Sequence, residues 1–178
     1  MKRIISALLF MALILPFCFT LSACNPTDDG ADSGDAKDSD GLVKITEDFT
    51  VIYNSYDMRE YALASDFAED FLDKYGVELN SKPYTEEEQN FEIQLGTLNT
   101  RSEYIAAKPT LDAHASAGIG VCVLKSTENK LSLFASNSKA LTVGIEELFK
   151  LIGEEGKYEV GLDKLIIFDM KKYELTGE

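Results

Sequence analysis

The order of apolar and polar residues divides the chain into a short apolar N-terminal segment, a polar stretch and a folded region. Residues 4–20 are almost wholly apolar, but the segment contains Pro16 and is too short for a comfortable bilayer crossing. The folded region begins near Ile45. Its first element is FTVIY at residues 49–53, where β-branched and aromatic residues predict a buried strand.

A long amphipathic helix is predicted directly after this strand. Asp57 is its expected N-cap, and Glu60 follows three residues later, which is the spacing of a capping box. Gly76 supplies the left-handed residue that often ends a helix. The apolar face repeats at intervals of three and four residues, as Met58, Tyr61, Ala64, Ala68, Phe71, Leu72 and Tyr75.

Shorter elements are predicted between this helix and the next apolar run. Residues 77–90 are expected to hold a short strand and then an exposed loop. FEIQL at residues 91–95 alternates as a half-buried strand does. The following TLNTRSEYIAA leads into a short helix that begins at Ser102 and is predicted to end at Lys108 and Pro109.

Two further strands and a final apolar run follow. Residues 118–124 and 130–135 are predicted to pair as a hairpin, because a short polar turn joins them. The last apolar run, residues 164–168, is predicted to be an edge strand or an extended segment packed on the core.

A second main helix is predicted over about residues 138–152. Asn137 or Ser136 is expected to cap it, and Gly153 to close it. Gly144 weakens a helix by about 1 kcal/mol relative to Ala, so it is expected to allow close approach of this helix to the sheet.

This order of elements predicts a single α+β domain over residues 45–178. Two main helices and four or five strands fit most economically as a two-layer sandwich, in which one mixed sheet carries both helices on one face. The length allows one core of ordinary size but not two.

The N-terminal segment has the features of a bacterial secretory signal. Lys2 and Arg3 form a positive region ahead of the apolar run. The closing residues 21–24, Leu-Ser-Ala-Cys, resemble the lipobox of bacterial lipoproteins. The resemblance implies that residues 1–23 are a lipoprotein signal peptide and that the thiol of Cys24 carries acyl chains such as palmitate. It also implies an extracytoplasmic protein that is anchored through Cys24 to the bacterial cell membrane.

Residues 24–44 are predicted to be the lipidated cysteine and an acidic, disordered tether. The segment is rich in Asp, Gly and Ser and holds no aromatic residue, so it cannot bury enough apolar surface to order itself. A flexible chain of this length has a reach of roughly 25 Å. The domain is therefore expected to be held clear of the lipid headgroups.

Charge and cysteine content restrict the partners. Residues 24–178 carry 15 basic and 31 acidic side chains, a formal balance of −16. This charge repels phosphate backbones and anionic headgroups, so we expect no nucleic acid partner and a membrane contact through lipid alone. With Cys24 acylated, only Cys122 remains, and no intramolecular disulfide can form.

The assembled pattern resembles a known domain. FTVIY with its helix, then FEIQLGTLNTRSE, then GIGVCVL and KLSLFASNSKALTVGIEELFKLIG are similar to the N-terminal α/β domain that precedes the barrel in family 20 β-hexosaminidases and family 67 α-glucuronidases. The resemblance covers about residues 47–153. In those hydrolases this domain is an accessory domain and the catalytic carboxylates lie on the barrel. The resemblance therefore implies a fold and a carbohydrate-related setting, not hydrolysis.

The chain departs from that family at two positions. Ser136 and Asn137 stand where the family often has a pair of glycines, and the loop reads GTLNTRSE where many relatives have Gly-Asn-Thr-Asn-Arg.

Few residues suggest catalysis or metal binding. His114 is the only histidine of the sequence, and Cys122 lies in an apolar run that predicts a buried thiol. The run at residues 86–88, three glutamates, reads as a solvated loop and lacks the buried acid that glycoside cleavage needs. A calcium-loop spacing at Asp38, Asp40, Gly41 and Glu47 has Ala36 at its first position, so a solvated spacer is favoured. No cofactor and no metal are expected.

The best candidate ligand-binding residues lie in the loop that follows FEIQL. Asn99, Arg101 and Glu103 come directly after a buried strand, where the ends of sheets commonly present binding groups. Arg101 is suited to hydrogen-bond a sugar hydroxyl or a carboxylate. The alternative is that Asn99 and Arg101 satisfy loop carbonyls and the end of the short helix.

Three hypotheses for the function follow. The first is a non-catalytic cell-surface lipoprotein that binds or scaffolds, alongside carbohydrate-processing proteins or with a carbohydrate or surface protein as partner. The second is a small glycan or cell-wall hydrolase that uses surface carboxylates. The third is a protein-docking domain whose interface is a sheet edge. The absence of a paired acid and base motif in the sequence favours the first and the third, so we expect no enzymatic activity.

Overall fold

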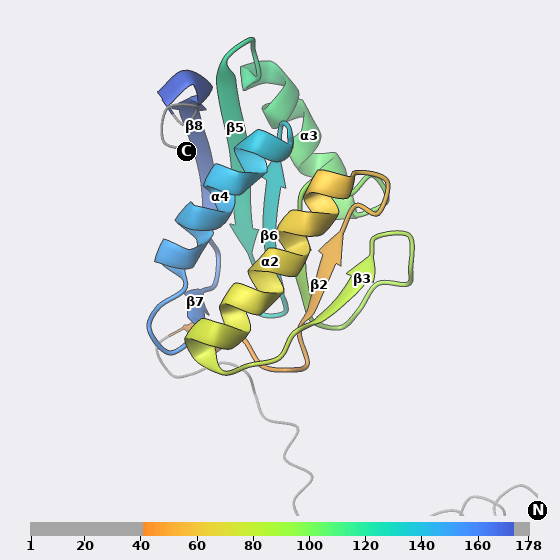
Figure 1. Cartoon of the computed structure of the whole chain (residues 1–178), viewed down its shortest axis with the longest axis vertical. Coiled ribbons are helices and arrows are strands. Elements are labelled where there is room, and N and C mark those ends of the chain that lie inside the picture. The colour runs from red at the N-terminus through yellow and green to blue at the C-terminus, as the bar shows by residue number, and fades with distance from the viewer. Residues whose placement is uncertain (1–40, 173–178) are drawn as a thin grey trace, which may run out of the picture. The chain divides into compact units, whose positions relative to one another are not determined.

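A computed structural model describes residues 41–172 of this chain. The expected signal peptide, the lipobox with Cys24, and Asp38 and Asp40 of the calcium-loop spacing lie outside these residues. Within residues 41–172 the chain forms a six-stranded mixed sheet, a separate two-stranded sheet and three α-helices (Figure 1). The α+β class and the mixed sheet are confirmed, and the sheet has one strand more than the upper number predicted.

The elements are, in chain order, β1 (Leu42–Lys44), β2 (Thr50–Tyr53), α2 (Met58–Tyr75), β3 (Asn80–Pro83), β4 (Glu92–Leu95), α3 (Ser102–His114), β5 (Ile119–Ser126), β6 (Lys130–Ala135), α4 (Ser138–Leu151), β7 (Lys157–Glu159), β8 (Asp163–Asp169) and a 3-10 turn at Met170–Lys172.

The strand order of the large sheet is β3-β2-β4-β6-β5-β8. The four strands β3, β2, β4 and β6 are parallel, with Val51, Ile93 and Leu131 side by side in register. The predicted hairpin is confirmed as the antiparallel pair β5 and β6. The final apolar run forms β8, which pairs antiparallel with β5 and lies at one edge of the sheet.

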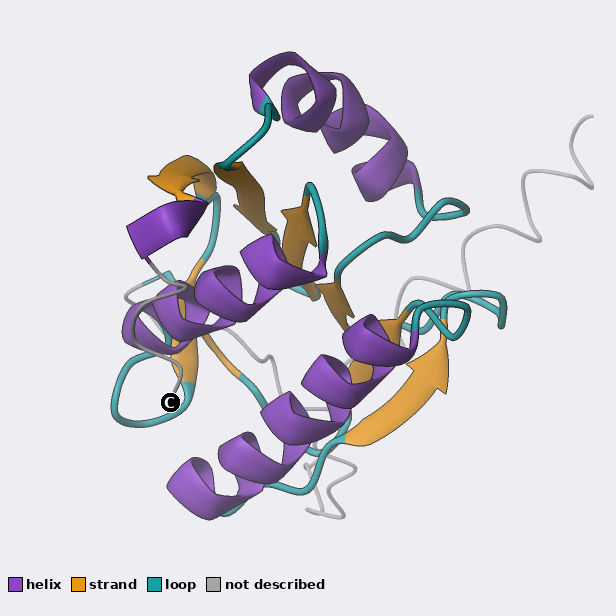
Figure 2. Cartoon of the chain, turned by 45° about the horizontal axis from the view of Figure 1, so that its top comes forward, coloured by secondary structure: helices purple, strands orange, loops and turns teal. Residues whose placement is uncertain are grey.

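The two faces of the sheet have separate cores. Helices α2 and α4 cover one face, as predicted, and α3 covers the other (Figure 2). Along β6 the side chains alternate between them: Leu133 packs toward α2 and α4, whereas Phe134 packs toward α3. The predicted two-layer sandwich therefore gains a third layer. Fully burying a side chain of this size stabilises the fold by roughly 1.5–3 kcal/mol.

The ends of α2 follow the predicted capping signals. The Asp57 carboxylate accepts hydrogen bonds from the backbone N–H groups of Arg59, at 2.9 Å, and Glu60, at 3.2 Å. At the other end Gly76 adopts a left-handed φ of 70° and donates its N–H to the Leu72 carbonyl.

Helix α4 confirms both its predicted cap and the expected role of its glycine. The Asn137 side chain accepts a hydrogen bond of 2.9 Å from the Ala140 N–H. A Cβ placed on Gly144 would lie 2.8 Å from Cys122 Sγ and 3.1 Å from a methyl of Leu133. Gly144 therefore allows α4 to lie closer to the sheet than any larger residue would.

Helix α3 is longer than predicted. It extends to His114 and contains Pro109, so the prediction that it ends at Lys108 and Pro109 is wrong. Pro109 removes one backbone hydrogen bond. Burial of Ala107 and Leu111, one on each side of the proline, against the sheet holds the helix together.

A small two-stranded sheet holds the start of the domain. β1 pairs antiparallel with β7, with Val43 opposite Tyr158, and both side chains are fully buried. The Ile45 N–H also donates to the Gly156 carbonyl at 2.9 Å. Residues 42–44, predicted as part of the tether, therefore belong to the folded region. No helix within residues 41–172 is long and apolar enough to cross a membrane.

Candidate functional site

The carboxyl ends of the parallel strands β2, β4 and β6 meet at one edge of the sheet, called here the carboxyl edge. It consists of residues 53–57, 96–97 and 136–138, which follow these strands. Helices α2 and α4 each begin directly after one of these strands, so both N-termini lie at this edge (Figure 1). In open α/β sheets ligands bind preferentially at this edge.

A buried carboxylate joins two of these segments. Glu60, which is 2% exposed, accepts hydrogen bonds from the Thr97 N–H at 2.8 Å and from the Thr97 hydroxyl at 2.7 Å. The capping box is thus only half formed, because Asp57 bonds the Glu60 N–H while the Glu60 carboxylate reaches across to Thr97. Gly96 makes this possible, since a Cβ there would lie 2.4 Å from the Glu60 carboxylate.

Burial raises the pKa of the Glu60 carboxyl group above its ordinary value, and the negative charge of Asp57 adds to the shift. The hydrogen bonds from Thr97 act in the opposite direction but do not cancel it.

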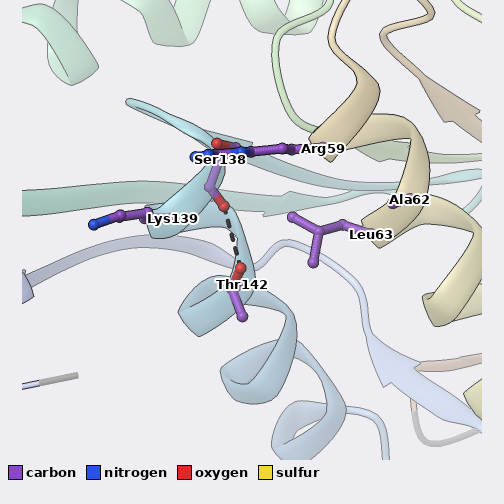
Figure 3. A pocket seen from close by; sticks show the side chains of 6 residues that line it. All are labelled: Arg59, Ala62, Leu63, Ser138, Lys139 and Thr142. Carbon is purple, nitrogen blue, oxygen red and sulfur yellow. Dashed lines mark hydrogen bonds between the residues drawn. The ribbon is translucent and has the colours of Figure 1, made fainter. Parts of the chain in front are cut away.

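A groove of about 320 Å³ lies at the same edge, between the N-terminal turns of α2 and α4. Its lining residues are Arg59, Ala62 and Leu63 from α2 and Ser138, Lys139 and Thr142 from α4. Figure 3 shows that Arg59 extends toward Ser138 and that Leu63 points toward Thr142, whose hydroxyl donates to the Ser138 carbonyl at 3.2 Å. A second hollow of about 350 Å³ shares Arg59, Ser138 and Lys139 with it.

Charges of both signs lie around the groove, because Arg59 and Lys139 line it and the Asp57 carboxylate caps the first turn of α2. Two helix N-termini carry partial positive charge at this edge, and Arg59 and Lys139 add two cations. Within residues 41–172 the Arg59 guanidinium makes no hydrogen bond and no ion pair with another side chain, although its backbone N–H is capped by Asp57. The groove thus combines a cation, hydroxyl groups and a small apolar wall.

A tyrosine cluster, made of Tyr53, Tyr56, Tyr61 and Tyr84, surrounds the end of β2 at the same edge. Tyr53 and Tyr61 have ring centroids 5.1 Å apart, and Tyr56 and Tyr84 have centroids 6.3 Å apart in an edge-to-face arrangement. Tyr56 is 80% exposed and Tyr61 is 51% exposed. These amphipathic rings give the edge an apolar contact surface next to its polar groups.

The predicted ligand-binding residue Arg101 lies elsewhere. Its guanidinium is buried and donates to the Tyr84 carbonyl at 3.1 Å, to the Glu86 carbonyl at 3.2 Å and to the Glu92 carboxylate at 2.9 Å. Its Nε atom is buried without a partner. Arg101 thus has the structural role that was predicted as the alternative to ligand binding, because it donates hydrogen bonds to loop carbonyls.

Glu92 continues this network across the α3 face of the sheet. Its carboxylate accepts from the Gln94 amide at 2.7 Å, and the Gln94 amide oxygen accepts from the Ser132 hydroxyl at 3.0 Å. All three side chains are buried. The network is internal and does not reach the groove.

The other two predicted residues are also separated from the groove. Glu103 accepts from Lys130 at 2.7 Å, at the amino end of β6, and Lys130 also pairs with Glu88. Although partial burial acts upward on the pKa of Glu103, the hydrogen bonds and charge of Lys130 bring the net shift downward. Asn99 is exposed. The ligand-binding role of the three residues stays a prediction.

Arg101 and Glu103 lie away from the groove because of the path of the loop after β4. Thr97 lies at the carboxyl edge, as a loop after β4 must, but Leu98 is fully buried in the α3 core. The chain therefore doubles back over the sheet, and Arg101 and Glu103 reach the amino ends of β4 and β6.

The remaining candidates occupy ordinary positions. His114 is exposed, and its Nδ1 lies 2.9 Å from the Thr110 carbonyl. Cys122 is fully buried, and burial raises the pKa of its thiol to about 12. Among residues 41–172 no three His, Cys, Asp or Glu side chains are grouped closely enough to hold a metal ion.

Sequence reasoning missed Arg59, Glu60 and Ser138 as residues of the site. The capping pattern singled out Glu60 but indicated Asp57 as its partner, and Thr97 is 37 residues away along the chain. The signal that was present is the start of two helices directly after two parallel strands.

No family model matches the sequence, and no curated protein matches it. Among 26 chains of solved structures that match, one is CpGH84D, a protein of glycoside hydrolase family 84. The two chains share 14% sequence identity with a TM-score of 0.43, over 72% of this chain and 21% of CpGH84D. The chain thus spans about a fifth of the length of CpGH84D.

Proposed function

We propose that this chain is a lipid-anchored, extracytoplasmic binding protein of the bacterial cell surface that binds carbohydrate without acting on it. The observation that carries the proposal is the groove between α2 and α4, where Arg59 lies beside hydroxyl groups and a small apolar wall. Its volume of about 320 Å³ is at the lower end of ligand pockets, which suits a ligand of one or two sugar rings.

The chemistry of the groove favours a saccharide that carries a carboxylate. Arg59 supplies the fork of donors that recognises a carboxylate, and Ser138 and Thr142 supply hydroxyl oxygens. Polyanions are disfavoured, because the chain after residue 23 has a formal balance of −16. A short, singly charged saccharide is therefore the best fit.

The route of the chain supports a binding role at the surface. β1 and β7 lie at the amino ends of the large sheet, next to the C-terminal ends of α2 and α4, and the groove lies at the opposite edge (Figure 1). If Cys24 is acylated, the tether joins the domain on the side away from the groove. The point of attachment would then leave the groove uncovered.

Lipidation is tested in cells by replacement of Cys24. We expect the wild-type protein to incorporate labelled palmitate and to fractionate with the membrane, and Cys24→Ala to do neither. Cys122→Ala is the matched control and should behave as wild type, since its thiol is buried. Membrane retention of Cys24→Ala without label would contradict the anchor.

Ligand binding is tested with D-glucuronic acid and D-glucose as probes. We expect saturation-transfer NMR to detect the acid and the Arg59→Gln variant to weaken its binding about tenfold, as loss of a bidentate charged contact does. Lys108→Gln removes an exposed cation on α3 and should leave binding unchanged. Equal binding by Arg59→Gln and wild type would contradict the groove as the site.

The alternative function is a small glycan hydrolase, and one observation favours it. Glu60 is a buried carboxyl group with a raised pKa at the carboxyl edge, which is the property of a general acid. The glutamates at residues 86–88 are exposed. Turnover of chromogenic glycosides that disappears in Glu60→Gln would support this alternative.

A further inference from the structure

The two edges of the six-stranded sheet differ in how they are protected. One edge is β3, a polar strand of four residues that contains Lys82 and ends at Pro83. Short length, lysine and proline are features with which proteins prevent pairing at an open edge. The other edge is β8, which has seven residues, contains no proline and is apolar over residues 165–168.

The backbone of β8 presents unpaired groups at this edge. Ser136 donates its N–H to the Val121 carbonyl at 2.9 Å, so Val121 of β5 directs its backbone groups toward β6. Neighbouring residues of a strand alternate in direction, and Cys122 of β5 therefore bonds toward Ile166 of β8. It follows that Leu165 and Ile167 direct their N–H and C=O groups away from β5, where no strand within residues 41–172 pairs with them.

The same two residues also present exposed side chains. Leu165 is 44% exposed and Ile167 is 50% exposed, next to Val123 and Val121 of β5 in register. An apolar stripe and a row of free backbone groups thus coincide. This combination is the one that binds an added strand.

The charges at the two ends of β8 argue against a second copy as the partner. Asp163 and Asp169 lie on the same face as Leu165 and Ile167, one at each end of the strand. The two-fold antiparallel register that pairs all seven residues is centred on Ile166. It places Leu165 opposite Ile167 but also places Asp163 opposite Asp169 twice. Like charges directly opposite each other destabilise a strand pair. Asp163 lies 3.5 Å from Lys125 and is 72% exposed in its side chain, so much of its charge remains open to a partner.

We propose that the outer edge of β8 docks an extended segment of another polypeptide, which adds a seventh strand to the sheet. The segment has apolar side chains at two alternate positions, against Leu165 and Ile167, and basic side chains at the two flanking alternate positions, against Asp163 and Asp169. Its affinity comes from backbone hydrogen bonds and its selectivity from the two charges. No residue of β8 lines the groove, and this proposal does not depend on the saccharide proposal.

The test uses the synthetic peptide Lys-Thr-Val-Thr-Val-Thr-Lys as probe. We expect NMR titration to shift the amide signals of Leu165 and Ile167. The peptide with Glu in place of both Lys residues should bind at least about tenfold more weakly, and so should a peptide N-methylated on its backbone.

Three protein variants separate pairing from general effects. Ile167→Pro removes an outward N–H at an edge, where proline is tolerated, and should abolish binding. Leu165→Lys should weaken binding at least about tenfold. The matched control Ile105→Lys introduces the same charge at a residue of α3 that is 57% exposed, and should bind as wild type.

Three results would each overturn the proposal. The first is equal binding of the lysine and glutamate peptides, and the second is equal binding by wild type and a correctly folded Ile167→Pro. The third is a concentration-dependent dimer that Leu165→Lys dissociates, because a second copy would then occupy the edge.

Discussion

At the scale of single residues, the buried charges hold distant segments together. Glu60 ties the first turn of α2 to Thr97 after β4, and Arg101 ties the start of α3 to Glu92 and to the carbonyls of Tyr84 and Glu86. A buried charge is costly when it is left alone, and hydrogen-bonding partners reduce that cost. These two contacts therefore set the path of the loop over residues 96–101.

Glu60→Gln should change the pH dependence of stability. The folded-state pKa of Glu60 is raised. The stability that protonated Glu60 contributes is therefore fully present below the pKa of Glu in the unfolded chain, about 4.3. That contribution is lost as the pH rises through the folded-state pKa. Gln keeps acceptor and donor groups for Thr97 but does not ionise. Urea unfolding between pH 4 and 8 should show the wild type losing stability relative to the variant as the pH rises. A constant difference would contradict this.

Arg101→Met should strongly destabilise the domain. It leaves the Glu92 carboxylate buried without a counterion, and breaking such a pair costs about 3–5 kcal/mol. The double variant Arg101→Met with Glu92→Leu should recover part of that loss. Lys108→Met breaks an exposed pair and should cost less than about 1 kcal/mol. Urea unfolding measures all three, and equal losses for Arg101→Met and Lys108→Met would contradict the buried role.

At the scale of elements, packing distance decides the effect of a change at Gly144. Alanine favours a helix by about 1 kcal/mol over glycine, but its Cβ would lie 2.8 Å from the buried Cys122 Sγ and 3.1 Å from Leu133. Overpacking in a core costs about 1–3 kcal/mol. We therefore expect Gly144→Ala to lower the free energy of unfolding by up to about 2 kcal/mol.

A double-mutant cycle checks this reason. Cys122→Ala removes the sulfur that the new methyl group meets, so Gly144→Ala should cost less in that background than in the wild type. Additive effects of the two substitutions would show that the contact with Cys122 is not the cause.

Elements whose signals lie within one segment were predicted well. Helices α2 and α4 carry their caps in the local sequence, and both N-terminal caps are as predicted. The apolar face predicted for α2 is partly wrong, because Met58, Tyr61 and Leu72 are exposed and Phe67, which was not included, is buried. The continuation of α3 past Pro109 depends on burial of Leu111 against the sheet, which no local pattern reveals. β1 and β7 have three residues each, and only their pairing with one another makes them strands.

In the candidate site, too, some features follow from the local sequence and others depend on tertiary contacts. The sequence indicated that the loop after β4 lies at a sheet end, and Thr97 does lie there. Arg101 and Glu103 follow the chain as it turns back over the α3 face, a turn that depends on burial of Leu98. The groove depends on Arg59 and Ser138, which are 79 residues apart and meet only because two helices start at one edge.

At the scale of the whole molecule, two cores share one sheet, so neither face can unfold without exposing the other. Cys122 can serve as a probe of this joint unfolding, because its thiol is fully buried and the pKa of the thiol is raised to about 12. In a chain that begins at Asn25, Cys122 is the single thiol. We expect a thiol reagent at pH 8 to label it only through global unfolding, at a rate that urea increases in parallel with the unfolding rate. Rapid labelling without denaturant would indicate local opening of α4.

The small β1–β7 sheet determines how the domain would respond to a pull from its N-terminal side. Force applied at Leu42 is carried first by three paired residues and the Ile45–Gly156 bond, and not by the six-stranded sheet. Detachment of β1 would lengthen the chain by roughly 10 Å, at about 3.4 Å for each extended residue, while the large sheet stays paired. A force on the N-terminal side would thus detach β1 before it deformed the groove or β8.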